Sequence, residues 1–143
     1  MNYTVQRFTI HRETVEDTDV QDITDDVVQC IRDSGVHEGS CLVFVAGATA
    51  SITTMEFESG CVADLTRCLE SLAPSRKHYE HNARWGDGNG YSHVRAALMK
   101  PGITVPVASG APMLGTWQQI VLLDFDNRPR RREVVVQVSG STG

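Results

Sequence analysis

The 143-residue sequence has little that would place it in a membrane or outside the cell. It contains no apolar run approaching the roughly 20 residues that a membrane-spanning helix needs. Residues 1–7 show no basic segment followed by an apolar one, so we expect no signal peptide. From these features we expect a cytoplasmic location and no membrane partner.

Cysteines at metal-binding spacing are also lacking. The 4 cysteines, at positions 30, 41, 61 and 68, form no C-x-x-C motif, and a zinc site would need more ligands at closer spacing. Cys30, Cys61 and Cys68 fall in segments with helical periodicity, and Cys41 begins an apolar strand. Buried, reduced thiols are therefore expected.

Positive charge is scarce, since 13 Lys and Arg residues face 18 Asp and Glu residues. Four arginines nevertheless cluster in Arg128-Pro129-Arg130-Arg131-Arg132. Such a cluster could contact nucleic acid, but no aromatic residues are interleaved with it and the whole chain is acidic. We interpret it as a solvated turn, or a subunit contact, between two strands, and we expect no nucleic-acid partner.

Hydrophobic periodicity predicts a single α+β domain over residues 1–143. Helices are expected from a cap at Thr24 to a stop at Gly35, over 62–72, and from a cap at Ser92 to Met99. Strands are expected at 3–10, 41–46, 48–57, 103–108, 112–114, 118–125 and 133–138. The acidic segment that begins at residue 12 is expected to be loop until Val20, and residues 79–91 are expected to be a polar, glycine-rich loop. Thr49, Ser51 and Thr53 would share one strand face, which lines a pocket or meets solvent.

The segment 79–95 concentrates residues suited to chemistry. It holds two histidines, one aspartate, two asparagines, two arginines and three glycines within seventeen residues. His81 and His93 can bind metal or move protons. Free backbone amides where the helix starts at Ser92, with Arg95 one turn later, predict a phosphate cradle. The alternative is a tight turn with an ordinary helix cap; the segment matches neither the P-loop nor the dinucleotide glycine motif.

Several sequence blocks carry a family resemblance through their order and spacing. They are Tyr79-Glu80-His81, Gly88 to Leu98, Thr104-Val105-Pro106-Val107, Gly110, Gly115-Thr116-Trp117-Gln118-Gln119-Ile120 and Arg128-Pro129-Arg130-Arg131-Arg132. Together they resemble the YjbQ family, also called uncharacterised protein family 0047, from about residue 5 to 140. The resemblance implies a two-sheet mixed β-sandwich of jelly-roll-like character with two or three flanking helices. It also implies a homotrimer and a secondary thiamine-phosphate synthase activity.

The chain departs from this family pattern where a metal would bind. Many relatives carry His-Thr where this chain has Gly47-Ala48, Asn in place of Met55 and Asp in place of Asn82, although Glu56 matches. A third imidazole is therefore absent. We expect a metal site that is weaker than in relatives or differently built.

The resemblance and the residue types together define the predicted site. The predicted metal ligands are His81, His93 and Glu56, suited to a divalent ion such as zinc, manganese or magnesium. The predicted catalytic residues are His81, His93 and Asp87. The predicted substrate-binding residues are Asn89, Ser92, Arg95 and Gln118. The alternative for each histidine is a structural, hydrogen-bonded imidazole, and Trp117 is either core or a stacking wall.

The functional hypothesis is a metal-assisted enzyme that acts on a phosphorylated small molecule. The resemblance implies transfer of a pyrimidine-methyl group to a thiazole phosphate, as in thiamine-phosphate synthases. The alternatives are a non-catalytic ligand-binding or structural homotrimer that has lost activity, and a metal-assisted phosphohydrolase. A hydrolytic triad is not supported, because no serine has a convincing base and orienting acid beside it.

Overall fold

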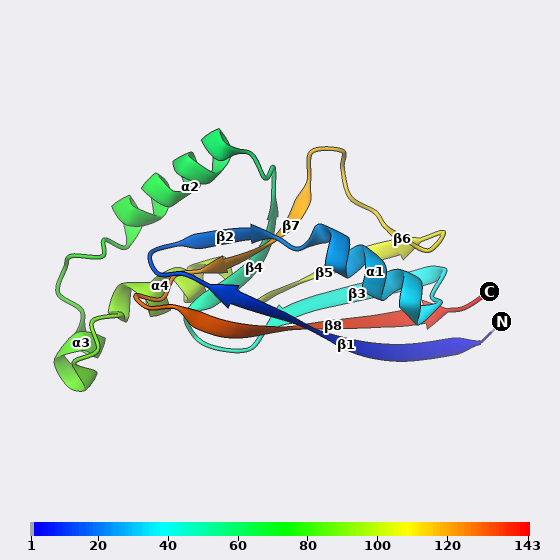
Figure 1. Cartoon of the computed structure of the whole chain (residues 1–143), viewed down its shortest axis with the longest axis horizontal. Coiled ribbons are helices and arrows are strands. Elements are labelled where there is room, and N and C mark those ends of the chain that lie inside the picture. Colours follow the sequence, from blue (N-terminus) through cyan, green and yellow to red (C-terminus); the bar gives the residue numbers. More distant parts are fainter. Residues whose placement is uncertain (1) are drawn as a thin grey trace.

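Two antiparallel sheets form the centre of the protein, whose computed structural model describes residues 2–143 (Figure 1). The larger sheet has the order β1-β8-β3-β5-β6, with β1 Tyr3–Thr14, β8 Arg130–Ser141, β3 Glu38–Val45, β5 Gly102–Ala108 and β6 Ala111–Pro112. The smaller sheet has the order β2-β7-β4, with β2 Asp19–Asp22, β7 Gln119–Asp124 and β4 Ala50–Met55. The helices are α1 Thr24–Ser34, α2 Ser59–Leu72, α3 Glu80–Trp85 and α4 Gly90–Met99. The predicted two-sheet α+β fold is confirmed.

The hydrophobic core is built from alternating strand residues and one helix. On β8, Val134 and Val136 are fully buried, and they pair with Val45 and Val43 of β3. Ile31 of α1 packs on the same cluster. Each such side chain stabilises the fold by about 1.5–3 kcal/mol when it leaves water.

Helix ends agree with the sequence signals in part. Thr24 was predicted to cap α1, but it is the first residue of the helix, and its hydroxyl donates to Asp22 Oδ1 at 2.6 Å instead of capping. Gly35 ends α1 in the left-handed conformation, with φ of 74°, as predicted. Helix α2 begins at Ser59, earlier than predicted, because the Glu58 carboxylate accepts hydrogen bonds from the backbone N–H groups of Gly60 and Cys61 at 2.7 and 2.6 Å. The chain caps this helix with a glutamate, which sequence rules rank below serine, threonine or aspartate.

Two regions predicted to be loop are regular structure. Residues 80–85 form α3, which Gly86 ends with φ of 72°. The six residues of α3 are too few to show a clear 3.6-residue period. In the other segment, β1 continues to Thr14 and β2 begins at Asp19, so only residues 15–18 of the expected loop lie outside strands.

The two terminal strands are longer than predicted, and this changes the interpretation of the arginine cluster. β1 and β8 pair over twelve residues each, from Tyr3 opposite Ser141 to Thr14 opposite Arg130. The last three arginines of the cluster therefore belong to a strand, and Arg132 is only 8% exposed. The interpretation of the whole cluster as a solvated turn was wrong for this part.

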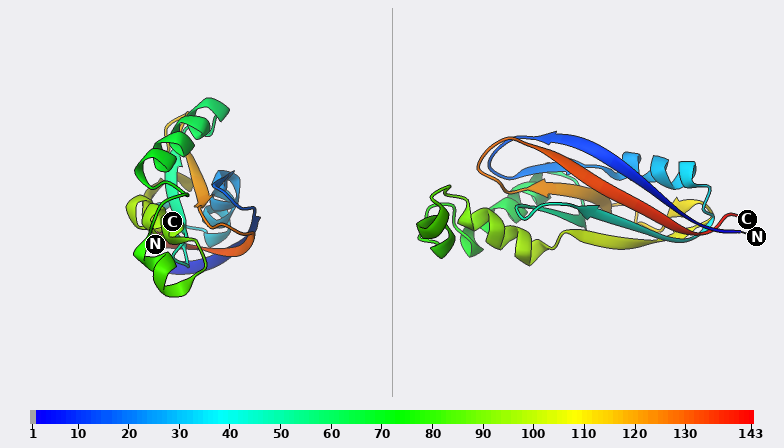
Figure 2. Two further views of the ribbon diagram at one scale, coloured as in Figure 1. Left: turned by 90° about the vertical axis from the view of Figure 1, so that its left-hand side faces the viewer. Right: turned by 90° about the horizontal axis from the view of Figure 1, so that it is seen from below.

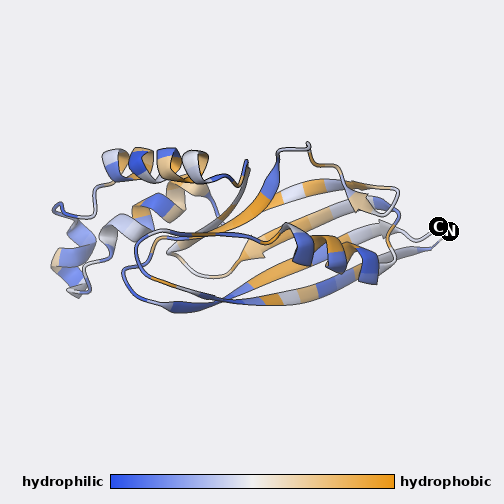
Figure 3. Cartoon of the chain, turned by 45° about the horizontal axis from the view of Figure 1, so that its top comes forward, coloured by the Kyte–Doolittle hydropathy of each residue, from blue (hydrophilic) through white to orange (hydrophobic). Residues whose placement is uncertain are grey.

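The long axis of the molecule separates the helical end from the chain ends. Helices α3 and α4 lie at one end and the two termini lie at the other (Figure 2). Apolar residues concentrate on the strands, whereas α3 is mostly polar (Figure 3). Within residues 2–143, no helix is long and apolar enough to cross a bilayer.

Candidate functional site

A cleft of about 520 Å³ opens at the helical end of the sheets. Five segments form it: the connection between β3 and β4, α3, the connection between α3 and α4, the start of α4 and the start of β8. We call it the histidine cleft. It is lined by Gly47, Ala48, Thr49, His81, Trp85, Asp87, Asn89, His93, Arg130 and Arg132.

The three predicted catalytic side chains come together in this cleft. His81 from α3 and His93 from α4 stack with ring centroids 4.3 Å apart and planes inclined by 38°. Asp87, between the two helices, places Oδ1 3.4 Å from His81 Nδ1. Burial lowers the pKa of His93, and the adjacent His81 lowers it further, while Asp87 and Asp126 act in the opposite direction. His93 is therefore a neutral imidazole at pH 7.

The buried carboxylate of Asp126 holds the base of the cleft together. It accepts hydrogen bonds from Thr49 Oγ1 at 3.0 Å, Asn89 Nδ2 at 3.2 Å and Arg130 Nε at 2.8 Å. Burial alone would raise the pKa of Asp126, but these bonds and the Asn127 N–H together lower it. Asp126 is thus an anion at neutral pH, and its two oxygens accept four hydrogen bonds, from Thr49, Asn89, Arg130 and the Asn127 N–H.

A second buried carboxylate, Asp124, fixes Arg132. Arg132 donates from Nε and Nη2 to the two oxygens of Asp124, at 2.7 and 2.9 Å, and from Nη2 to Thr49 Oγ1 at 2.6 Å. Thr14 of β1 donates to Asp124 Oδ2 at 2.6 Å. Because the pair is bidentate and shielded from water, the position of the guanidinium is rigid.

Sequence reasoning missed the four charged residues of this network and Trp85. Asp124 and Asp126 are two residues apart, as are Arg130 and Arg132, so each pair lies on one face of an extended chain. That alternation was the available signal. Among the three residues of the predicted polar strand face, Thr49 is the one that lines the cleft.

Of the predicted phosphate cradle, only Asn89 lines the histidine cleft. Ser92 is fully buried and donates to the Phe125 carbonyl at 2.5 Å. Helix α4 begins at Gly90, and the backbone N–H groups of Ser92 and His93 donate to the Asn89 carbonyl at 3.0 and 3.3 Å. These amides are therefore not free, contrary to the prediction.

Arg95 lies in a different hollow, beside Tyr91 and Thr18. It is 2% exposed, donates to the Ala73 carbonyl through Nε and Nη2 at 3.0 and 2.9 Å, and pairs with Glu70 at 2.6 Å. These contacts tie α4 to α2. Arg95 therefore lies outside the histidine cleft, and its predicted role of holding phosphate there was wrong.

Gln118 and Trp117 also lie away from the cleft. Gln118 donates to Thr54 Oγ1 at 3.1 Å and accepts from the Gly115 N–H at 3.0 Å, beside a separate shallow groove. Trp117 is 74% exposed, so within one chain it is neither core nor a wall of the histidine cleft.

The predicted metal ligands do not form one set within a chain. Thr49 of the cleft precedes β4, while Glu56 follows it, and a six-residue strand spans about 20 Å. Nowhere along residues 2–143 are three or more His, Cys, Asp or Glu side chains placed to hold a metal. The residues of one chain therefore do not fit the predicted metal.

Comparisons with known proteins agree with this fold. Residues 7–141 match the family described as "UPF0047 protein YjbQ-like". A UPF0047 protein of Archaeoglobus fulgidus is 36% identical over 87% of this chain and 94% of its own length, and one of Mycobacterium tuberculosis is 38% identical over 82% and 94%. A solved YbjQ-like protein of unknown function from Sulfolobus solfataricus has a TM-score of 0.93 at 31% identity, covering 98% of this chain and 100% of its own. A YjbQ/UPF0047 structure from Clostridium acetobutylicum has a TM-score of 0.84 at 30% identity, covering 92% and 98%.

Proposed function

The chain belongs to the UPF0047 protein YjbQ-like family, and on that premise we propose that its histidine cleft binds a phosphorylated small molecule and transfers protons to and from it. The observation that carries the proposal is the stacked imidazole pair, 4.3 Å apart, in the same cleft as the Arg130 guanidinium. Imidazoles suit proton transfer near pH 7, and a guanidinium suits a phosphate group.

Arg130 is the cationic side chain best placed to contact a ligand. Its Nε donates to Asp126, whereas its two terminal nitrogens have no hydrogen-bond partner in the described chain, and its side chain is 33% exposed. Two parallel N–H groups remain for a phosphate. Trp85 lines the same cleft, is 67% exposed and offers a flat face to an aromatic ring of the ligand.

In this proposal, His93 takes up a proton as the phosphorylated ligand binds and gives it to the leaving group. Because its pKa is lowered, the imidazole is neutral at pH 7 and can take a proton. An arriving phosphate dianion favours the protonated ring, which can then return the proton to a leaving group. Asp87 Oδ1 lies 3.4 Å from His81 Nδ1, where its negative charge favours protonation of the partner ring.

The reaction that we propose is the one implied by the family resemblance, transfer of a pyrimidine-methyl group from its diphosphate to a thiazole phosphate. The bond from the methylene carbon to the diphosphate oxygen breaks, and the unprotonated ring nitrogen of the thiazole bonds to the same carbon. No proton leaves the thiazole, so the proton in this step passes from protonated His93 to the departing pyrophosphate. Arg130 stabilises the charge on the departing pyrophosphate. A metal-assisted phosphohydrolase remains an alternative, because it would use the same anion contacts.

Assistance by zinc, manganese or magnesium stays a prediction, and no step is assigned to a metal here. His81, His93 and Asp87 line the cleft without Glu56, and Gly47 stands where the family resemblance implies an imidazole. Elemental analysis of the purified protein tests this prediction independently of activity. A stoichiometric divalent ion, with a lower melting temperature after chelation, is the result that would support it.

The competing proposal is a cytoplasmic homotrimer that binds the ligand without catalysis. Gly47-Ala48 removes an imidazole from the cleft wall, which favours lost activity. On β3, Leu42 and Phe44 are 37% and 40% exposed, so the outer face of the larger sheet offers apolar surface for a subunit contact. We propose the trimer for the active protein as well. A monomer mass in light scattering would contradict it.

A synthase assay on matched histidine variants tests the proposed function. His93→Ala should lower the rate at least about 100-fold, because the group that protonates the departing pyrophosphate is removed. The control is His78→Ala, since the His78 side chain is 72% exposed and lies outside the cleft. Synthase activity that is equal in the two variants would refute the catalytic role of His93.

A further inference from the structure

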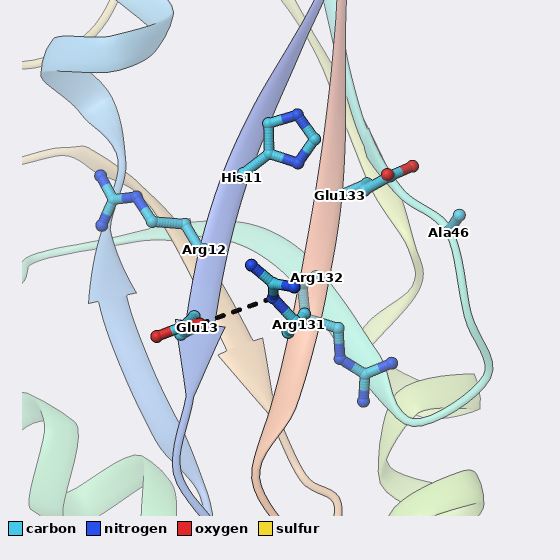
Figure 4. Close-up of a pocket in the computed structure, with 7 residues that line it drawn as sticks. All are labelled: His11, Arg12, Glu13, Ala46, Arg131, Arg132 and Glu133. Carbon is cyan, nitrogen blue, oxygen red and sulfur yellow. Dashed lines mark ion pairs between the residues drawn. The ribbon is translucent and has the colours of Figure 1, made fainter.

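A second cavity, of about 660 Å³, adjoins the histidine cleft at Arg132. We call it the strand cavity. Figure 4 shows its lining side chains, which come mainly from β1 and β8: His11, Arg12, Glu13, Ala46, Arg131, Arg132 and Glu133. Ala46 lines the strand cavity, and the next two residues, Gly47 and Ala48, line the histidine cleft. Arg132, the residue common to both linings, therefore lies where the two hollows meet.

One nitrogen of Arg132 is left without a partner at this junction. Nε and Nη2 are used by Asp124 and Thr49, whereas Nη1 donates to no residue between 2 and 143. Nη1 is also accessible to solvent. In residues 2–143, the buried side-chain nitrogen and oxygen atoms without a hydrogen-bond partner are His81 Nδ1 and Asn89 Oδ1, and Arg132 Nη1 is not one of them. A residue that is 8% exposed thus keeps one cationic N–H₂ group within reach of a ligand.

Gly47 is what keeps this nitrogen accessible. A Cβ atom at position 47 would lie 2.8 Å from Arg132 Nη1, closer than side-chain atoms normally approach. The backbone of Gly47 has φ of 122°, a conformation that only glycine adopts readily. The glycine therefore serves the turn and leaves the space beside the guanidinium open.

We propose that Arg132 Nη1 and Arg130 together bind one phosphate group of the ligand at this junction, and that Gly47 is the residue that permits it. This inference rests on the proposed function and gives the phosphate its position. Both guanidiniums approach the same atom, Asp126 Oδ2, from Arg130 Nε at 2.8 Å and from Arg132 Nη2 at 3.8 Å. They are close enough for the oxygens of one tetrahedral phosphate to accept from both.

The location also sets the direction of the rest of the ligand. Beyond the junction, the strand cavity is also lined by His11 and Glu133, which face each other on β1 and β8 (Figure 4). Glu13 and Arg131 pair there at 3.5 Å with exposed side chains of 80% and 90%, a weak contact that water screens. The organic part of the ligand can therefore occupy either hollow without breaking a buried pair.

Calorimetric titration with inorganic phosphate at low salt tests the proposal. In Gly47→Ala the added methyl group displaces Arg132 Nη1, so phosphate affinity should fall at least about tenfold, the usual loss for a charge-assisted hydrogen bond. The matched control is Gly35→Ala, where φ is also positive at 74° but an added Cβ meets no atom within 4 Å. Its phosphate affinity should stay within about twofold of wild type, because residue 35 lines neither cavity.

Side-chain NMR of the wild-type protein decides the question if Gly47→Ala fails to fold. Phosphate should shift the Nε–H signals of Arg130 and Arg132 and leave that of Arg95, which lies in a different hollow and donates to the Ala73 carbonyl, unchanged. Phosphate binding that Arg130→Gln weakens but Gly47→Ala does not would overturn this inference alone. No phosphate binding by the wild-type protein would overturn the proposed function with it.

Discussion

Asp126→Asn is the substitution that tests the buried network most sharply. The amide has the shape of the carboxylate, but it replaces one of two acceptor oxygens by an NH₂ group. Oδ1 accepts from Asn89 and the Asn127 N–H, and Oδ2 accepts from Thr49 and Arg130. Either orientation of the amide therefore leaves two donors without an acceptor.

The cost follows from the burial of these groups. Each buried donor that loses its acceptor costs about 1–3 kcal/mol. Arg130 is one-third exposed and can recover a water molecule, so its share falls at the low end. We expect the free energy of unfolding to fall by about 3 kcal/mol, and the melting temperature by about 10 °C.

Thermal unfolding followed by circular dichroism measures this loss. The control is Asp33→Asn, because Asp33 is exposed and its contact, a hydrogen bond accepted from Gln29, is retained by an amide oxygen. If Asp126→Asn lowers the melting temperature no more than the control does, the network does not stabilise the fold and the reasoning is refuted.

The loss should also depend on pH with a definite sign. The folded-state pKa of Asp126 lies below its usual value, so its carboxylate stabilises the fold above the unfolded pKa of about 3.9. This contribution is lost as the pH falls below that value. The difference in stability between wild type and Asp126→Asn should therefore be full at pH 6–7 and shrink below about pH 4.

Two further predictions concern groups outside the cleft. Burial raises the pKa of Cys41 to about 12 and also raises that of Cys30. A thiol reagent at pH 8 should therefore modify the exposed Cys68 in the native protein and leave Cys30 and Cys41 unmodified. Rapid modification of Cys41 would contradict its burial. Arg95→Leu removes the partner of Glu70 and the contacts to α2, so stability should fall by about 2–4 kcal/mol in urea unfolding while phosphate affinity stays unchanged. Weaker phosphate binding by a folded Arg95→Leu protein would show that Arg95 contributes to phosphate binding after all.

The sequence predicted those parts of the fold whose signals are local. Gly35 ends α1 as expected, because the left-handed position depends on the glycine alone. The buried valines of β8 alternate clearly enough to show a strand. Helix α3 was missed because its stop, Gly86, was interpreted as one more flexible residue of a polar loop.

The site was predicted in part, for a physical reason. His81 and His93 are twelve residues apart in one polar segment, so the sequence alone could predict that the two side chains lie close together. Arg95 meets Glu70, twenty-five residues away, and only the packing of two helices reveals that its charge is already neutralised. Arg132 and Asp124 are eight residues apart, but β8 and β7 belong to different sheets, so their pairing depends on how the chain passes from one sheet to the other.

Imidazole NMR of the wild-type protein during a titration with inorganic phosphate at pH 7 tests the central claim most directly. Phosphate binding in the histidine cleft predicts that the ring signals of His81 and His93 shift together and saturate at the same phosphate concentration. His37 and His78, which lie outside the cleft, serve as internal controls and should stay unchanged. Ring signals of His81 and His93 that do not move at saturating phosphate would contradict the assignment of this cleft as the binding site.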